Sequence, residues 1–153
     1  MVKEKSPLTK FTHVGSIVKD INKAVAHYEK MGMGPFKRFT LPGPGFEFID
    51  WPDDKLKFEC AYGQIGSEIG LELFQPVSGN IGNKGEHIWH IGYDVENMDK
   101  TIAWMAERGF KVIATTTYVD GSRECRFGTA EPGGVLIQTH ELVKGSHLEE
   151  FFK

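Results

Sequence analysis

The sequence predicts an α+β fold in which two βαβββ modules form one curved eight-stranded sheet around a cleft. The first observation is an internal repeat: His13-Val14-Gly15 returns as His90-Ile91-Gly92, an offset of 77 residues in a chain of 153. Further matches at this offset are Val18 with Val95, Lys23 with Lys100, Ala26 with Ala103 and Gly32 with Gly109. The second observation is that each copy contains one helical pattern among strand patterns. Self-similarity at a single period indicates two copies of one supersecondary unit.

The first module spans about residues 8–77. A β-branched and aromatic stretch predicts a strand over 10–18, and Asp20 is a suitable N-cap for a helix over 20–31. Apolar side chains of that helix fall at the i, i+3, i+4, i+7 spacing, and Gly32 ends it. Strands are expected over 35–40, 56–63 and 68–74, followed by a linker over 76–84.

The second module spans about residues 85–143 and repeats this order. We expect strands over 87–95, 111–119, 124–129 and 134–140, and a helix over 97–108 that Asn97 caps. The two helices are expected to cover the outside of the sheet, which leaves the cleft on its concave face. Residues 144–153 are predicted to form a C-terminal arm, whose adjacent Phe151 and Phe152 dock on the body or on a second subunit. The whole chain, 1–153, is predicted to be a single domain.

The first module is about ten residues longer than the second, and the extra length lies around residues 46–54. An insertion in one copy is suited to form a lid or a pocket wall on one side of a shared site. Its aromatic side chains have two interpretations. Phe46, Phe48 and Trp51 either belong to the core or line a pocket for a bulky apolar or aromatic substrate.

Composition limits the classes of function. The net charge is −3 without a long basic run, so we expect no nucleic-acid partner, and no apolar stretch is long enough to span a membrane. The N-terminus lacks the apolar segment of a secretory signal. Cys60 and Cys125 share no metal-binding or redox spacing, which favours two reduced thiols in a cytoplasmic protein.

The equivalent histidines indicate a metal site. A lone strand histidine is usually packed or exposed, but His13 and His90 hold the same place in both copies and could converge across a pseudo-twofold axis. The last strand of each copy offers a second ligand, Glu72 and Gln138. Glu72 would instead face solvent if Leu71 and Leu73 pointed inward. His87 lies three positions before His90, faces the opposite side of the strand and is expected at the surface.

The paired His-[Val/Ile]-Gly motifs, Leu-Glu-Leu-Phe-Gln-Pro at 71–76 and Gly-Gly-Val-Leu-Ile-Gln at 133–138 resemble the vicinal oxygen chelate superfamily (glyoxalase/bleomycin resistance/dioxygenase). The resemblance covers roughly residues 10–143 and, within the superfamily, is strongest to the methylmalonyl-CoA epimerases. It implies paired βαβββ modules with a metal in the cleft, bound by His13, Glu72, His90 and Gln138. Epimerases usually carry Glu where this chain has Gln138. A set of two imidazoles, one carboxylate and one amide suits a divalent metal: Co, Ni, Mn, Zn or Fe.

The resemblance implies a metal-dependent epimerase or isomerase that works through a metal-stabilised enolate. The epimerases use a Glu on the third strand of the first half as base, which gives Glu59 as the first candidate and Glu47 as the second. Either could equally be an ordinary exposed carboxylate. A mechanism in which a last-strand ligand acts as base would have to use Glu72, because the amide of Gln138 is not a useful proton acceptor.

Two further classes of function remain open. One is another enzyme of the same fold, either an Fe(II) extradiol-type dioxygenase or a glyoxalase-like lyase; the other is a metal-free small-molecule binding protein. The expected partner is a small-molecule substrate, with an acyl-CoA among the candidates, and the resemblance implies a homodimer. Basic side chains available for the phosphates of such a substrate are Lys37, Arg38, Lys55, Lys57, Arg123 and Arg126.

Overall fold

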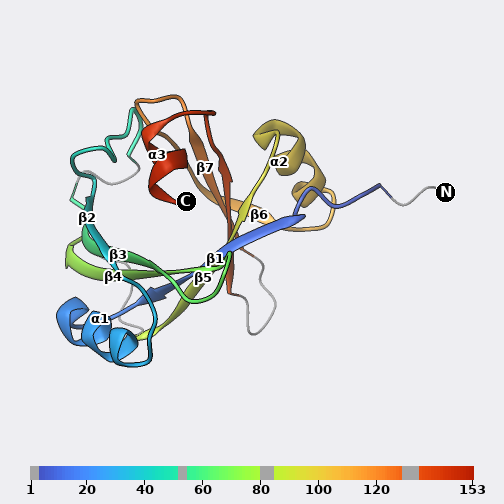
Figure 1. Cartoon of the computed structure of the whole chain (residues 1–153). Helices are drawn as coiled ribbons and strands as arrows, with labels where there is room; N and C mark the ends of the chain where they lie inside the picture. The colour runs from blue at the N-terminus through green and yellow to red at the C-terminus, as the bar shows by residue number, and fades with distance from the viewer. Residues whose placement is uncertain (1–3, 52–54, 80–84, 129–134) are drawn as a thin grey trace.

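The computed structural model describes residues 4–51, 55–79, 85–128 and 135–153, and it confirms the predicted fold class. Its strands form one sheet in the order β2-β3-β4-β1-β5-β8-β7-β6, curled into a half-barrel (Figure 1). The strands are β1 (Lys10–Ile17), β2 (Lys37–Leu41), β3 (Lys57–Gln64), β4 (Gly70–Ser78), β5 (His87–Asp94), β6 (Lys111–Thr117), β7 (Arg123–Gly128) and β8 (Leu136–Glu141). The helices are α1 (Ile21–Lys30), α2 (Met98–Ala106) and α3 (His147–Phe151).

The two modules join through their first strands at the centre of the sheet. β1 pairs antiparallel with β5, and each of them pairs in parallel with the last strand of its own module, β4 or β8. In the central pair His13 lies opposite Gly92, and Gly15 lies opposite His90. The repeated motif of one module is therefore in direct register with that of the other.

Helices α1 and α2 cover the convex face, as predicted. Each helix begins at the expected cap: the side chain of Asp20 accepts a hydrogen bond from Lys23 N, and that of Asn97 accepts one from Lys100 N. Beneath α1, Ile21 packs with Ala61, Leu71 and Leu73; beneath α2, Met98 and Met105 pack with Cys125 and Phe127. Because strand side chains alternate, the residues between these positions face the concave side.

The concave side is closed at one end by two segments that the repeat does not share. Phe46, in the insertion of module one, is 2% exposed and stacks on Phe39 with ring centroids 4.5 Å apart. The insertion continues to the far end of the sheet, where Ile49 N donates to Thr117 O at 2.7 Å and Val119 N donates to Glu47 O at 3.0 Å. It thus connects the region next to β2 with the end of β6, the two outer strands. Phe46 belongs to the core, and the partly buried Phe48 and Trp51 pack against it.

The C-terminal arm lies inside the curve of the sheet (Figure 1). Phe151 packs on Phe46, and Phe152 packs on Tyr62, at centroid distances of 4.8 and 5.0 Å. Of the two docking surfaces predicted for this aromatic pair, the body of the chain is the one observed.

Some boundaries of strands and loops differ from those predicted from the sequence. β4 continues to Ser78, so the start of the predicted linker is strand, because Lys57 and Phe58 of β3 pair with Ser78 and Pro76. Parts of three predicted features, at 52–54, 80–84 and 129–134, lie outside the described residues. Cys60 and Cys125 are buried free thiols, and no helix among the described residues is long and apolar enough to cross a membrane. The cytoplasmic location stays a prediction.

Candidate metal centre

The four ligands predicted from sequence meet at one point on the concave face. His13 Nε2 lies 3.2 Å from His90 Nε2 and 2.8 Å from Gln138 Oε1. Glu72 Oε2 lies 3.4 Å from His13 Nε2 and 3.5 Å from His90 Nε2. One ligand atom each from His13, Glu72 and His90 falls within 4.8 Å of the others. Each module contributes one imidazole and one oxygen donor.

Strand alternation explains why Glu72 is inside. Leu71 and Leu73 pack under α1 on the convex side, so Glu72 between them must face the cleft. The side chain is 4% exposed because the sheet is covered on both faces, and the alternative of a solvent-facing Glu72 does not apply. His87 lies near the surface, as expected, where its ring contacts Gly85 O.

Burial keeps the two histidines of the candidate site neutral. It lowers the pKa of His13 to about 4, against the opposing charge of Glu72, and it lowers that of His90 well below its usual value. Thr12 also favours one tautomer of His13. Its hydroxyl donates to Gly92 O at 3.2 Å, so its oxygen is free to accept from Nδ1–H of His13 at 2.9 Å. Nε2 of His13 then points its lone pair at the shared centre, as a metal ligand must.

The cluster fits a divalent cation on two counts. Glu72 Oε2 is buried and has no hydrogen-bond partner, an arrangement that is unfavourable unless something positive lies next to it. The lone pairs of His13 Nε2 and Gln138 Oε1 face one another at 2.8 Å, which is repulsive without a shared cation or proton. Two imidazoles, one carboxylate and one amide oxygen form a mixed nitrogen and oxygen set suited to first-row transition metals and zinc.

A second buried cluster lies beside these ligands and was not predicted from sequence. Glu124 on β7 receives hydrogen bonds or ion pairs from Arg126 Nη2 at 2.7 Å, Tyr118 OH at 3.0 Å and His140 Nε2 at 3.2 Å. The ring of His140 stacks on that of His13, with centroids 5.5 Å apart. His140 follows Gln138 by two positions, so strand periodicity could have placed both on the cleft side.

The charges of this second cluster compensate one another. Burial raises the pKa of Glu124, but Arg126 and the hydrogen bond from His140 outweigh that effect and hold the pKa well below its usual range. Burial lowers the pKa of His140, but its hydrogen bond with Glu124 and the charge of Glu124 raise it above its usual value. Glu124 is therefore an ionised carboxylate surrounded by donors.

The two carboxylates considered as bases lie elsewhere. Glu59 and Glu47 are both exposed. On β3 the alternation places Cys60 and Phe58 toward the cleft, so Glu59 shares the convex side with Ala61, beyond the cover of α1. Glu47 lies in the insertion, where its carbonyl pairs with Val119 N. The structure does not bring either side chain to the ligand cluster.

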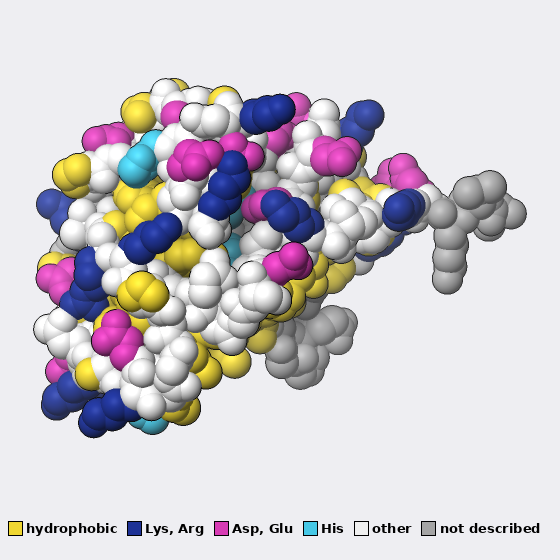
Figure 2. Space-filling view, in the orientation of Figure 1, with side chains coloured by type: hydrophobic (Ala, Val, Ile, Leu, Met, Phe, Trp, Pro, Cys, Tyr) yellow, Lys and Arg dark blue, Asp and Glu magenta, His cyan; other side chains and the backbone are white. Residues whose placement is uncertain are grey.

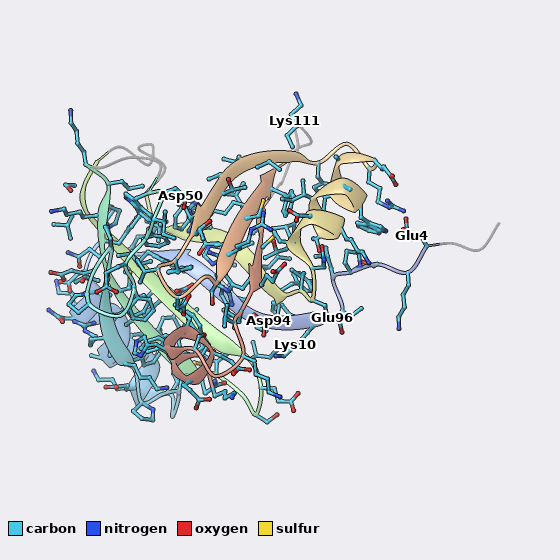
Figure 3. The ribbon with its side chains drawn as sticks, turned by 90° about the horizontal axis from the view of Figure 1, so that it is seen from above. Glu4, Lys10, Asp50, Asp94, Glu96 and Lys111 are labelled. Carbon is cyan, nitrogen blue, oxygen red and sulfur yellow. The ribbon has the colours of Figure 1, made fainter. Side chains whose placement is uncertain are left out.

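A cavity of about 770 Å³ reaches the cluster from the end where β1 begins. His13, Tyr62, His140 and Phe152 line its inner part. Figure 2 shows charged side chains around a hollow in which histidine atoms are partly visible. At the mouth Lys10 pairs with Asp94 at 2.7 Å, and Figure 3 shows both beside Glu96.

The lysines of this mouth are not the basic residues expected to meet phosphates. Those that line the cavity are Lys5, Lys10, Lys100 and Lys153. Arg126, which was counted among the available basic side chains, is instead buried, with its guanidinium 4.7 Å from the ring centroid of Trp89. Its partner Glu124 explains this placement, because a buried cation requires a nearby anion.

Comparison with solved structures gives the same fold. A methylmalonyl-CoA epimerase from Mycobacterium tuberculosis superposes with a TM-score of 0.65 at 20% identity, covering 92% of both chains. A hypothetical protein from Bacillus halodurans C-125 has a TM-score of 0.64 at 23% identity, covering 90% of this chain and 96% of that one. A Streptomyces coelicolor methylmalonyl-CoA epimerase variant in complex with 2-nitronate-propionyl-CoA has a TM-score of 0.62 at 18% identity, with coverage of 91% and 98%.

These identities are low, and no curated protein matches the chain by sequence. A family model does match: residues 12–129 fit that of the glyoxalase/bleomycin resistance protein/dioxygenase superfamily. The matched segment covers most of the chain and includes three of the four converging side chains. The chain therefore belongs to the glyoxalase/bleomycin resistance protein/dioxygenase superfamily.

Proposed function

We propose that this protein is a metal-dependent epimerase or isomerase that acts on a small carbonyl compound through an enolate. The observation that carries the proposal is the convergence of His13, Glu72, His90 and Gln138 beside a cavity of about 770 Å³ that His13 lines. The likeness to epimerase structures supports the reaction class.

Each of the four converging side chains would have its own role in binding the cation. His13 and His90 would hold the cation as neutral imidazoles, with Glu72 as the one anionic ligand and Gln138 as a neutral one. A divalent cation bound there would supply electrophilic stabilisation for the negative charge that develops on the substrate's carbonyl oxygen. Burial excludes water, which strengthens every electrostatic interaction in the site.

Glu72 is the carboxylate that we assign to proton transfer. It is buried at the ligand centre, and no donor among the described residues hydrogen-bonds its Oε2. Glu124, the other buried carboxylate among the described residues of the cleft, is already engaged by three donors. Glu59 and Glu47 are exposed and serve as natural comparisons.

An acyl-CoA is the first substrate to test. The four lysines of the mouth could contact its phosphates, although Lys10 and Lys153 are also paired with Asp94 and Glu149. If phosphates bind there, Lys100→Ala raises KM for a CoA thioester but leaves KM for a short thioester without phosphates unchanged. Equal KM changes for both compounds would exclude recognition of phosphates at Lys100.

The decisive experiment measures metal content and proton exchange in the same preparation. Protein purified without chelator is expected to contain about one divalent metal per chain, and to exchange the α-hydrogen of methylmalonyl-CoA for deuterium in D₂O. Glu72→Gln should abolish exchange, whereas Glu59→Gln and Glu47→Gln should retain it. Metal-free, inactive protein that takes up no added Co²⁺, Ni²⁺, Mn²⁺, Zn²⁺ or Fe²⁺ contradicts the proposal and favours a metal-free binding protein.

Two other reactions follow if metal is bound without epimerisation. Two histidines and one carboxylate within 4.8 Å of one another also form the set used by Fe(II) oxygenases, so an extradiol-type dioxygenase is the second candidate. Oxygen uptake with a catechol by the Fe(II)-loaded protein tests it. A glyoxalase-like lyase would instead convert the adduct of a thiol and a 2-oxoaldehyde.

We also propose a homodimer. β6 is an outer strand of the sheet and exposes Val112 and Ile113, at 44% and 57% of their full surface. Apolar side chains beside an open strand edge are typical of surfaces that pair with a second copy. Sedimentation velocity of the full chain, with Ile113→Lys as the disrupting variant, tests this assembly.

A further inference from the structure

The amide of Gln138 has two ends, and each has a different neighbour. Its Oε1 faces the ligand centre, 2.8 Å from His13 Nε2. On the neighbouring strand β7, Arg126 pairs directly with Gln138 and Glu124 pairs with His140, so Glu124 lies diagonally across from Gln138. Gln138 helps to lower the pKa of the Glu124 carboxyl as a hydrogen-bond donor, a role that only its amide NH₂ can fill.

Glu124 cannot turn away from the amide. Its side chain is 4% exposed and is held by Arg126, Tyr118 and His140. If the amide of Gln138 turned over, its oxygen would meet the carboxylate of Glu124, and its NH₂ would meet the ligand centre. Both contacts would be repulsive or unsatisfied once a cation is present, because a carboxylate accepts but does not donate.

We propose that Glu124 is a positioning residue that holds the amide of Gln138 with its oxygen toward the metal. This inference rests on the proposed metal site. It also gives a physical reason for an amide rather than a carboxylate at position 138. A second carboxylate would face Glu124 in a buried site, whereas an amide satisfies Glu124 and the cation at once. Outer partners that orient a ligand in this way typically change metal affinity 10–100-fold when they are removed.

The test is a double-mutant cycle on metal affinity with the full-length protein. Kd for Co²⁺ is measured for the unmodified chain, Glu124→Gln, Gln138→Ala and the double variant. If Glu124 acts through Gln138, Glu124→Gln weakens binding about 10–100-fold alone. In the Gln138→Ala background it weakens binding less than about twofold, because no amide is left to orient.

A spectrum separates orientation from general disturbance. The visible d–d bands of Co²⁺ in Glu124→Gln are expected to shift toward those of Gln138→Ala. Tyr118→Phe removes a different hydrogen bond from the same carboxylate and should leave both the bands and Kd unchanged within about twofold. If Glu124→Gln does not fold, Glu124→Asp keeps the charge opposite Arg126, shortens the reach to Gln138, and should give the same shift.

Two outcomes overturn the inference. One is an equal loss of affinity from Glu124→Gln in both backgrounds; the other is a folded Glu124→Gln protein that binds Co²⁺ with unchanged affinity and bands. These results are distinguishable from failure of the proposed function. In that case the unmodified chain itself binds no Co²⁺, so the reference affinity of the cycle cannot be measured.

Discussion

The imidazole of His13 occupies the space above Gly92. A Cβ atom added to Gly92 would lie 2.0 Å from His13 Cε1, and one added to Gly15 would lie 2.1 Å from His90 Cε1. The relationship is reciprocal because β1 and β5 run antiparallel with His13 opposite Gly92 and His90 opposite Gly15. The glycine of each His-X-Gly motif thus makes room for the histidine of the other module.

Gly92→Ala should displace the ring of His13. Neither Gly92 nor Gly15 has a positive φ, so alanine is compatible with the backbone, and the clash is with the imidazole. We expect the free energy of unfolding to fall by about 1–3 kcal/mol, as for other overpacked sites. Metal affinity should fall at least about tenfold, since one ligand is misplaced. Denaturant titration and metal titration measure the two effects.

Gly66→Ala is the matched control, because a Cβ at Gly66 meets nothing within 4 Å. A second check combines Gly92→Ala with His13→Ala. Removing the ring should make the added methyl group harmless, so that the double variant is no less stable than His13→Ala alone. If Gly92→Ala lowers the free energy of unfolding as much in the His13→Ala background as in the unmodified chain, the clash lies in the backbone rather than in the imidazole.

Phe152→Ala should open the inner end of the cavity. The ring of Phe152 stacks on His13 and His140, at centroid distances of 6.4 and 5.7 Å. We expect faster association of Co²⁺ with the metal-free protein in stopped-flow mixing, and a loss of about 1–2 kcal/mol of stability from reduced apolar burial. Phe151→Ala removes the neighbouring ring, which packs on Phe39 and Phe46, and should leave the association rate unchanged. An equal effect of both variants would count against a specific role for Phe152.

Asp50→Ala should loosen the insertion from the far end of the sheet. The side chain of Asp50, labelled in Figure 3, accepts a hydrogen bond from the backbone of Thr117. Its loss should lower the free energy of unfolding by about 1 kcal/mol and speed amide exchange at Thr117 and Val119. Glu47→Ala is the control, because Glu47 contributes its backbone carbonyl rather than its side chain. Unchanged exchange in Asp50→Ala would show that backbone pairing alone holds the segment.

The native cysteines should resist alkylation. Burial raises the pKa of Cys125 from 9.0 to about 12 and that of Cys60 well above 9.0. A raised pKa means less thiolate, so at pH 8 the reactive fraction of Cys125 falls about a thousandfold relative to an unperturbed thiol. Iodoacetamide should therefore modify both residues only on unfolding, with mass spectrometry as the readout. Rapid labelling of folded protein would contradict the burial of the two thiols.

The sequence was informative about the candidate ligands because they repeat. His13 and His90 hold equivalent places in two copies, and the pairing of β1 with β5 then brings them together. The last strands supplied Glu72 and Gln138 by the same logic, and each helix begins at the expected cap. Helix and strand periodicity is a local pattern, and the internal repeat occurs twice in the same chain. Both can therefore be recognised in a single sequence.

Features that have no counterpart in the other module were harder to predict from the sequence. The pairing of Ile49 with Thr117 and the docking of Phe152 depend on contacts between segments far apart in the sequence. The cluster around Glu124 needs the register of β7 against β8 before its members can be assigned to one face. For the same reason, Glu59 could be placed on a strand from the sequence, but its side of the sheet could not be determined.

The central pairing of β1 with β5 has one more consequence. Each module supplies only two of the four donors, so neither module alone would bind an ion tightly. An ion bound between them would link the two modules, and its removal with a chelator should weaken the packing between the modules before either module unfolds.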